Sequence, residues 1–234
     1  MALPKFVRPE FNLTIPSTGK RIKYHPFTVR EEKVLILAAE SQEQDEIANA
    51  IRNTLERCVS TPGFSVDELA LFDIEYLFLK ARSKSAGETI NVVCRDPNDE
   101  TYQTEHKIDI DKIKVTKNKD HSDLIELDEN THVKMKYPDI SFFESGVQLD
   151  DVENMSKVLC RCIGQIIVGE DVYSRQDMSE EELIEWVDGL TQVQYRKLIS
   201  FFETMPKLRH VIKLTNKNTG NDFEIVLEGL ADFF

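Results

Sequence analysis

The spacing of apolar residues changes twice along this chain, and those changes constrain the fold more than any motif does. Between Gly87 and Tyr137 apolar and polar residues alternate, as in Ile90, Val92 and Cys94, and a period of two is typical of strands. Before and after this segment, apolar residues recur at helical spacing. The pattern predicts an α+β fold: an N-terminal hairpin, central helices, a middle antiparallel β segment, C-terminal helices and a closing hairpin.

Capping boxes indicate where several helices begin. In this motif a Ser or Thr N-cap is followed three residues later by Glu or Gln. The motif occurs at Thr28, Ser65, Ser179 and Thr191. We expect the helix that starts at Ser65 to run to about residue 84. The spacing also predicts a helix over 43–59 and, after residue 149, a helical face formed by Val152, Met155, Leu159, Cys162 and Ile166.

Turn residues define a hairpin near each end of the chain. Residues 16–19, Pro-Ser-Thr-Gly, separate two alternating segments near the N-terminus, and residues 218–221, Asn-Thr-Gly-Asn, do the same near the C-terminus. We therefore divide the chain into a hairpin and helical region over 1–86, an antiparallel β segment over 87–138, and a helical region with a closing hairpin over 139–234. We expect these parts to form one compact unit with a β subdomain.

The charge argues against a nucleic-acid partner. Asp and Glu number 42 against 29 Lys and Arg, a formal net charge of −13, and an acidic surface repels phosphate backbones. The sequence shows no signal peptide and no apolar stretch of the ~20 residues that a membrane span needs, so no membrane partner is expected. The four cysteines are not spaced like a disulfide framework, which favours free core thiols in a reducing cytoplasm.

The sequence contains no motif that predicts catalysis or a cofactor. It has no phosphate-binding loop, no Gly-x-Ser-x-Gly and no Gly-x-Gly-x-x-Gly. Zinc ligands usually come in pairs two to four residues apart. The cysteines and histidines fail this spacing test, among them Cys94, His106, His121, His132 and the Cys160–Cys162 pair. We expect no enzyme activity, no metal and no cofactor.

Two pairs of adjacent aromatics are candidates for partner binding. Phe142 and Phe143 cannot both point into one core from a strand, so one of them is either exposed or covered by a partner; a loop packed over the core is the alternative for this segment. Phe233 and Phe234, with Leu230, end the chain, where apolar side chains are costly to leave in water. This tail either folds back onto the chain or binds a partner.

Several segments taken together resemble a known viral family. They are residues 1–6 (MALPKF), 13–19 (LTIPSTG), 26–35 (PFTVREEKVL), 72–79 (FDIEYLFL), 82–88 (RSKSAGE), 133–138 (VKMKYP), 201–206 (FFETMP) and 229–234 (GLADFF). Their order along nearly the whole chain is similar to that of the baseplate hub proteins of T4-like tailed bacteriophages, which are often described as hub assembly proteins. No single segment is chemically specific, and the resemblance depends on their joint occurrence.

The resemblance implies a non-enzymatic viral protein that binds other tail or baseplate hub proteins. It would act in the host cytoplasm during assembly, or be present in the baseplate of the virion. Two roles remain open: a transient assembly factor, and a permanent structural subunit of the hub. A metal-binding protein or metal-dependent enzyme is a third hypothesis. The resemblance also implies cysteine pairs in the middle β segment and the last hairpin of some relatives, whereas here Cys94 stands alone and the last hairpin has no cysteine. The copy number and the oligomeric state are not predicted.

Overall fold

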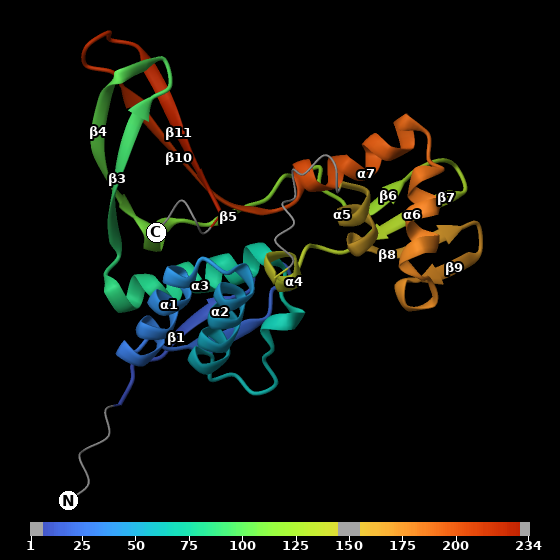
Figure 1. The fold of residues 1–234 in the computed structure, drawn as a ribbon, viewed down its shortest axis with the longest axis horizontal. Coiled ribbons are helices and arrows are strands. Elements are labelled where there is room, and N and C mark those ends of the chain that lie inside the picture. Colours follow the sequence, from blue (N-terminus) through green and yellow to red (C-terminus); the bar gives the residue numbers. More distant parts are fainter. Residues whose placement is uncertain (1–6, 145–154, 230–234) are drawn as a thin grey trace, which may run out of the picture. The chain divides into compact units, whose positions relative to one another are not determined.

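The computed structural model of the protein describes residues 7–144 and 155–229. Helices alternate with small antiparallel sheets along the described ranges (Figure 1), which confirms the predicted α+β fold class. The chain forms two compact units. Unit 1 comprises Met1–Thr116 and Lys207–Phe234, and unit 2 comprises Lys117–Pro206.

Unit 2 is an insertion into unit 1. Strand β5 (Val115–Thr116) pairs with the start of β10 (Lys207–Thr215), so that Thr116 faces Lys207. The Thr116 hydroxyl also donates a hydrogen bond to the Lys207 carbonyl at 3.1 Å. The chain therefore leaves unit 1 and re-enters it at two paired residues. The boundaries predicted after residues 86 and 138 lie within units 1 and 2, respectively.

The first part of unit 1 is a hairpin followed by helices. Strands β1 (Phe11–Thr14) and β2 (Arg21–Tyr24) form the predicted N-terminal hairpin. The helical elements are α1 (Val29–Ser41), α2 (Gln44–Cys58), the 3-10 turn η1 (Val66–Glu68) and α3 (Leu71–Ala86). Helix α3 is apolar on most sides and buries Leu77 and Leu79 completely, as its sequence predicts.

Helix α3 begins later than its capping signal predicts. Ser65 precedes only the single 3-10 turn, and the backbone is extended at Leu69 and Ala70 before the helix starts at Leu71. Leu69 and Ala70 are both buried. We attribute the delayed start to the burial of these two side chains, because tertiary packing routinely overrides a local capping preference.

The second part of unit 1 consists of two hairpins whose turns are tied together. Its elements are β3 (Thr89–Asp96), β4 (Asp99–Asp109), the 3-10 turn η2 (Ile110–Lys112), β10 and β11 (Asp222–Glu228). Asn216 lies in the turn between β10 and β11 and is fully buried. Its amide donates to the carboxylates of Asp96, at 2.7 Å, and Asp99, at 3.1 Å. Leu79 of α3 packs in the same core as Cys94 and Ile212 of these hairpins.

Unit 2 packs helices against a four-stranded sheet. The sheet has the order β6 (Leu124–Glu126), β7 (Thr131–Met135), β8 (Ile163–Val168) and β9 (Asp171–Ser174). The helical elements are α4 (Ile140–Glu144), α5 (Met155–Cys162), the 3-10 turn η3 (Arg175–Asp177), α6 (Glu180–Asp188) and α7 (Gln192–Thr204). Phe201 of α7, Val133 of β7 and Ile163 of β8 are completely buried in its core.

The helical face predicted to extend to Ile166 is wrong at this last residue. Met155, Leu159 and Cys162 lie in α5, and Val152 lies outside the described residues. Helix α5 ends at Cys162, and the next residues form β8, which pairs with β7. The segment is rich in β-branched residues, which favour strands. Gly164 also allows β8 to approach β7 closely, because a Cβ at this position would lie 3.1 Å from the carbonyl oxygen of Lys134. The deciding strand partner lies about thirty residues earlier in the chain, where local spacing carries no information about it.

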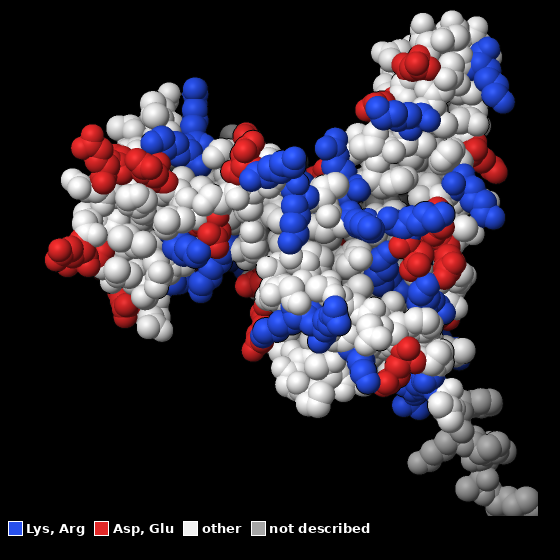
Figure 2. All heavy atoms as spheres, turned by 180° about the vertical axis from the view of Figure 1, so that it is seen from behind, with Lys and Arg blue, Asp and Glu red and all other residues white. Residues whose placement is uncertain are grey.

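The acidic charge is concentrated in unit 2. That unit has 9 Lys and Arg against 19 Asp and Glu, a formal charge of −10, whereas unit 1 has 20 against 23, a charge of −3. Figure 2 accordingly shows basic and acidic side chains intermixed over unit 1 on the face seen from behind. The net charge of the whole chain therefore does not describe the surface of unit 1.

Candidate functional site

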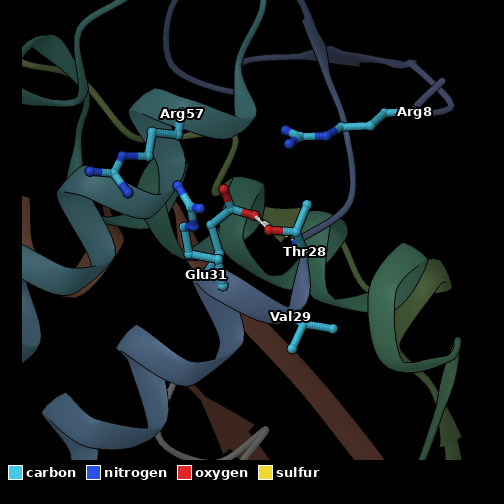
Figure 3. A pocket seen from close by; sticks show the side chains of 6 residues that line it. Arg8, Thr28, Val29, Glu31 and Arg57 are labelled. Carbon is cyan, nitrogen blue, oxygen red and sulfur yellow. Dashed lines mark hydrogen bonds between the residues drawn. The ribbon is translucent and has the colours of Figure 1, made fainter. Parts of the chain in front are cut away.

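A pocket lined by arginines lies at the start of α1. Its volume is about 720 Å³, and we call it the arginine pocket; it is lined by Arg8, Thr28, Val29, Arg30, Glu31 and Arg57. Arg8 comes from the segment before β1 and Arg57 from the last turn of α2. Figure 3 shows the carboxylate of Glu31 directed towards Thr28, with Arg8 and Arg57 on either side of it.

Glu31 is held in place by the capping box of α1. Its carboxylate accepts a hydrogen bond from the Thr28 amide at 2.6 Å and another from the Thr28 hydroxyl. Burial by itself would raise the pKa of Glu31, but these hydrogen bonds and the positive charges of Arg8 and His25 outweigh it, so that the pKa is lowered. Glu31 is therefore an ionised part of the helix cap.

His25 connects the segments that surround the arginine pocket. It is buried, and its ring nitrogens lie 2.9 Å from the carbonyl oxygens of Pro26 and Arg57. The guanidinium of Arg8 lies 3.2 Å from Nε2 of the same ring. These contacts connect the end of β2, the end of α2 and the segment that carries Arg8. The imidazole thus has a structural role between peptide carbonyls.

The guanidinium groups of Arg30 and Arg57 are available to a ligand, and that of Arg8 also contacts His25. Among the residues that the structure describes, Arg8, Arg30 and Arg57 form no ion pair with an acidic side chain. A guanidinium suits carboxylates because its planar donors bind both oxygens. The chemistry of the pocket therefore favours an acidic group.

Helix α1 presents several large apolar side chains to solvent. Val29 is 68% exposed, Ile36 58% and Leu37 65%, whereas the residues that it buries are Glu31 and Ala38. At 100° per residue, six of the exposed residues fall on one stripe about 120° wide, and the exposed Val34 and Ala39 lie outside it. We call this stripe the α1 face, and it consists of Val29, Arg30, Lys33, Ile36, Leu37 and Glu40. Contiguous apolar groups rimmed by charges mark a protein-binding surface.

An acidic segment lies at the opposite end of α1 from the arginine pocket. Helix α1 stops at Gln42, whose φ of 60° is left-handed. The exposed residues Glu40, Glu43, Asp45 and Glu46 surround this turn, and we call them the acidic corner. Their side chains form no ion pair within the described ranges. Helix α1 thus joins a basic end to an acidic end.

The residues that the sequence nominates for partner binding are elsewhere. Phe142 is 4% exposed in the core of unit 2, with the Arg161 guanidinium 4.4 Å from its ring centre. It lies in α4 rather than in a strand, and of the two adjacent aromatics it is one that packs inside. The side chain of Phe143 and the residues Leu230, Phe233 and Phe234 lie outside the described parts of the chain.

Sequence reasoning missed the α1 face. The signal was present in residues 34–39, Val-Leu-Ile-Leu-Ala-Ala, a run too continuously apolar for a helix that buries a single stripe. Such a run leaves large apolar side chains on the side that faces solvent. The arginine pocket gave no local signal, because its residues come from three separate segments.

The four cysteines are buried and free of disulfides. Burial raises the pKa of Cys58 to about 12 and that of Cys160 to about 11, and it also raises the pKa of Cys94 and Cys162. A thiol is nucleophilic as the thiolate. At neutral pH these cysteines are therefore protonated core residues.

The remaining metal candidates are divided between the units. Cys94 and His106 lie in the β3–β4 hairpin of unit 1, and His121 and His132 lie in unit 2. His121 packs against Phe201 and Tyr137, its ring nitrogens 3.0 Å from the Thr204 and Tyr137 hydroxyls; burial lowers its pKa despite the opposing charge of Asp123. Within residues 7–144 and 155–229, no three His, Cys, Asp or Glu residues are grouped as metal ligands. In the same ranges no helix has the length and apolar character of a membrane span.

Comparison with known protein families assigns the chain to one of them. The family described as "T4 bacteriophage base plate protein" matches residues 8–234. The chain belongs to this family. The match includes both units, and it agrees at this level with the resemblance to T4-like baseplate proteins. No curated protein and no solved structure matches the chain.

Proposed function

We propose that this member of the T4 base plate family helps to build the central hub of the tail baseplate, and that it acts by binding other tail proteins without catalysis. The observation that carries the proposal is the family match over residues 8–234. The α1 face supports the mode of action, because its exposed Ile36 and Leu37 suit a protein interface better than a water-exposed helix.

The chemistry of the described residues is consistent with a role in binding. The thiols are protonated, and the carboxylate that lines the arginine pocket, that of Glu31, is committed to the cap of α1. The exposed arginines and the acidic corner provide charge for recognition, which steers association between protein surfaces.

Two forms of this role differ in the fate of the protein. As an assembly factor it would promote hub formation and then leave, and its net charge of −13 suits a protein that must stay soluble while free. As a permanent subunit it would stay in the virion, and the family description, which names the base plate itself, favours this second candidate. In both cases the proposed partners are other baseplate proteins.

Quantitative mass spectrometry of purified virions tests the two forms. A fixed ratio to the other baseplate proteins supports the permanent subunit, whereas absence from virions that need the protein for assembly supports the assembly factor. If a phage that lacks the protein still forms complete baseplates, the proposed function is wrong in both forms.

The C-terminal aromatics remain proposed interface residues. We expect that deletion of Phe233 and Phe234 reduces baseplate assembly while the melting temperature of the protein stays close to that of the wild type. Replacement of both by Leu is the matched control, because it keeps an apolar tail. If the deletion instead lowers the melting temperature by several degrees and assembly of the folded protein is normal, the tail belongs to the core.

A further inference from the structure

We propose that the α1 face binds a second copy of this chain, with the two α1 helices antiparallel about a twofold axis. This self-association is additional to the binding of other tail proteins in the proposed function. It does not need that function to be correct, since it concerns the purified protein alone. Its basis is the arrangement of charge along α1, which is complementary to itself when one copy is reversed.

The apolar residues set the centre of the pairing. Ile36 and Leu37 lie midway along the α1 face and are more than half exposed. In a twofold interface, if one residue contacts a second, the second also contacts the first across the axis. An axis between these residues places Ile36 against the partner's Leu37 and buries both from water.

The same axis matches opposite charges on either side of the centre. Lys33 lies three residues before Ile36, and Glu40 lies three residues after Leu37. Reversal of one helix therefore places Lys33 beside the partner's Glu40, and this ion pair forms twice. Neither side chain has an ion-pair partner within the described residues of its own chain.

The two ends of α1 are matched in the same way. Arg30 belongs to the arginine pocket and precedes Ile36 by six residues; Glu43 belongs to the acidic corner and follows Leu37 by six residues, just beyond the end of α1. The antiparallel arrangement places the acidic corner of each copy over the arginine pocket of the other. It also sets the positive end of each helix dipole against the negative end of its neighbour, which is favourable. A different acidic protein would satisfy the pocket, but a second copy satisfies both ends and the apolar centre at once.

The expected complex is weak and depends on concentration. Helix α1 has 13 residues and is about 20 Å long at 1.5 Å per residue. One helix face of this length buries less area than the interfaces of stable complexes. We therefore expect a reversible monomer–dimer equilibrium.

Sedimentation equilibrium of the purified full-length protein tests the apolar centre. The wild type is expected to dimerise with rising concentration, and the Ile36→Glu/Leu37→Glu variant is expected to stay monomeric. Val193→Glu is the matched control, because Val193 is 67% exposed on α7 of unit 2 and its replacement is expected to leave dimerisation unchanged. A wild type that is monomeric throughout, or a double variant that dimerises like the wild type, overturns the proposal.

Charge reversal tests the orientation. Lys33→Glu and Glu40→Lys each place like charges together in their own homodimers, so each is expected to weaken dimerisation by about tenfold or more. An equimolar mixture of the two variants restores both opposite-charge pairs and is expected to form a heterodimer with an affinity near that of the wild type. If the mixture remains as weak as the separate variants, the two helices are not paired in this way. All the substitutions are at solvent-exposed positions, and a thermal melt verifies that each variant is folded.

Discussion

Units 1 and 2 form their hydrophobic cores from differently arranged parts of the chain. Unit 2 is one continuous segment whose sheet and helices share a single core. Unit 1 needs both ends of the chain, because Leu79 of α3 packs with residues of β10 and β11 that lie more than a hundred positions later. Contacts between distant segments are slow to form. We therefore expect unit 2 to fold first and to bring Thr116 and Lys207 together for unit 1.

The units also differ in charge and in exposed surface. Unit 2 carries −10 of the net charge of −13, and unit 1 is nearly balanced. The α1 face, with its apolar centre and its oppositely charged ends, belongs to unit 1. We infer that unit 2 contributes most to solubility, and the binding surface that we propose lies in unit 1.

Separation of the units is the strongest test of this comparison and has the largest expected effect. Residues 117–206 can be replaced by Asn-Gly, a two-residue turn suited to the antiparallel pair Thr116–Lys207. We expect both the shortened unit 1 and the isolated segment 117–206 to unfold cooperatively by circular dichroism, each with its own transition. An unfolded product of either kind would show that the units depend on each other.

A core substitution in unit 2 has the second largest expected effect. Phe201 is completely buried, and its ring centre lies 5.5 Å from that of Tyr137. Phe201→Ala is expected to lower the free energy of unfolding of unit 2 by about 3–5 kcal/mol and to leave the transition of unit 1 in place. Leu79→Ala is the counterpart in unit 1. If calorimetry shows that one substitution lowers the free energy of unfolding equally in both transitions, the two cores are coupled.

The N-terminal hairpin of unit 1, formed by β1 and β2, is hydrogen-bonded to a buried carboxylate of α3. Asp73 of α3 is fully buried and accepts hydrogen bonds from the Ser17 amide, at 3.0 Å, and from the Ser17 hydroxyl. Asp73→Ala is expected to cost about 2–3 kcal/mol in denaturant unfolding, because it removes charge-assisted hydrogen bonds inside the protein. Asp73→Asn retains an acceptor and should cost less. Equal losses for both variants would assign the effect to the charge.

The smallest expected effect is the pH dependence of the α1 cap. Because the pKa of Glu31 is lowered in the folded protein, its contribution to stability is complete above the ordinary carboxyl value of 4.5 and is lost as the pH falls through the folded pKa. Glu31→Gln keeps the hydrogen-bonding shape but not the charge. Its stability relative to the wild type should therefore be lowest near neutral pH and recover on acidification. A constant difference between pH 7 and pH 3 would contradict this account.

The sequence predicts those features that depend on neighbouring residues. The capping boxes at Thr28, Ser179 and Thr191 all form, because a cap needs only the next three residues. Both terminal hairpins also form where alternation and turn residues predict them. The α+β class follows from these local patterns.

Features that depend on distant residues were not predicted. Ile163–Val168 became a strand because β7 was available to pair with it, and unit 1 closes through residues from both ends of the chain. The arginine pocket likewise gathers Arg8, Arg30 and Arg57 from separate segments. Phe142 could be nominated from its aromatic neighbour, but its burial depends on the core that α4 meets.

Complementation of a phage that lacks this protein tests the central claim, that the protein acts through its surface and not through a reactive group. Variants are supplied in trans, and assembled baseplates are counted by electron microscopy. The account predicts that Ile36→Glu/Leu37→Glu abolishes assembly, whereas Val193→Glu and Cys58→Ala support it once their folding is verified. Normal assembly with the α1 double variant, or its loss with the folded Cys58→Ala variant, would contradict the account.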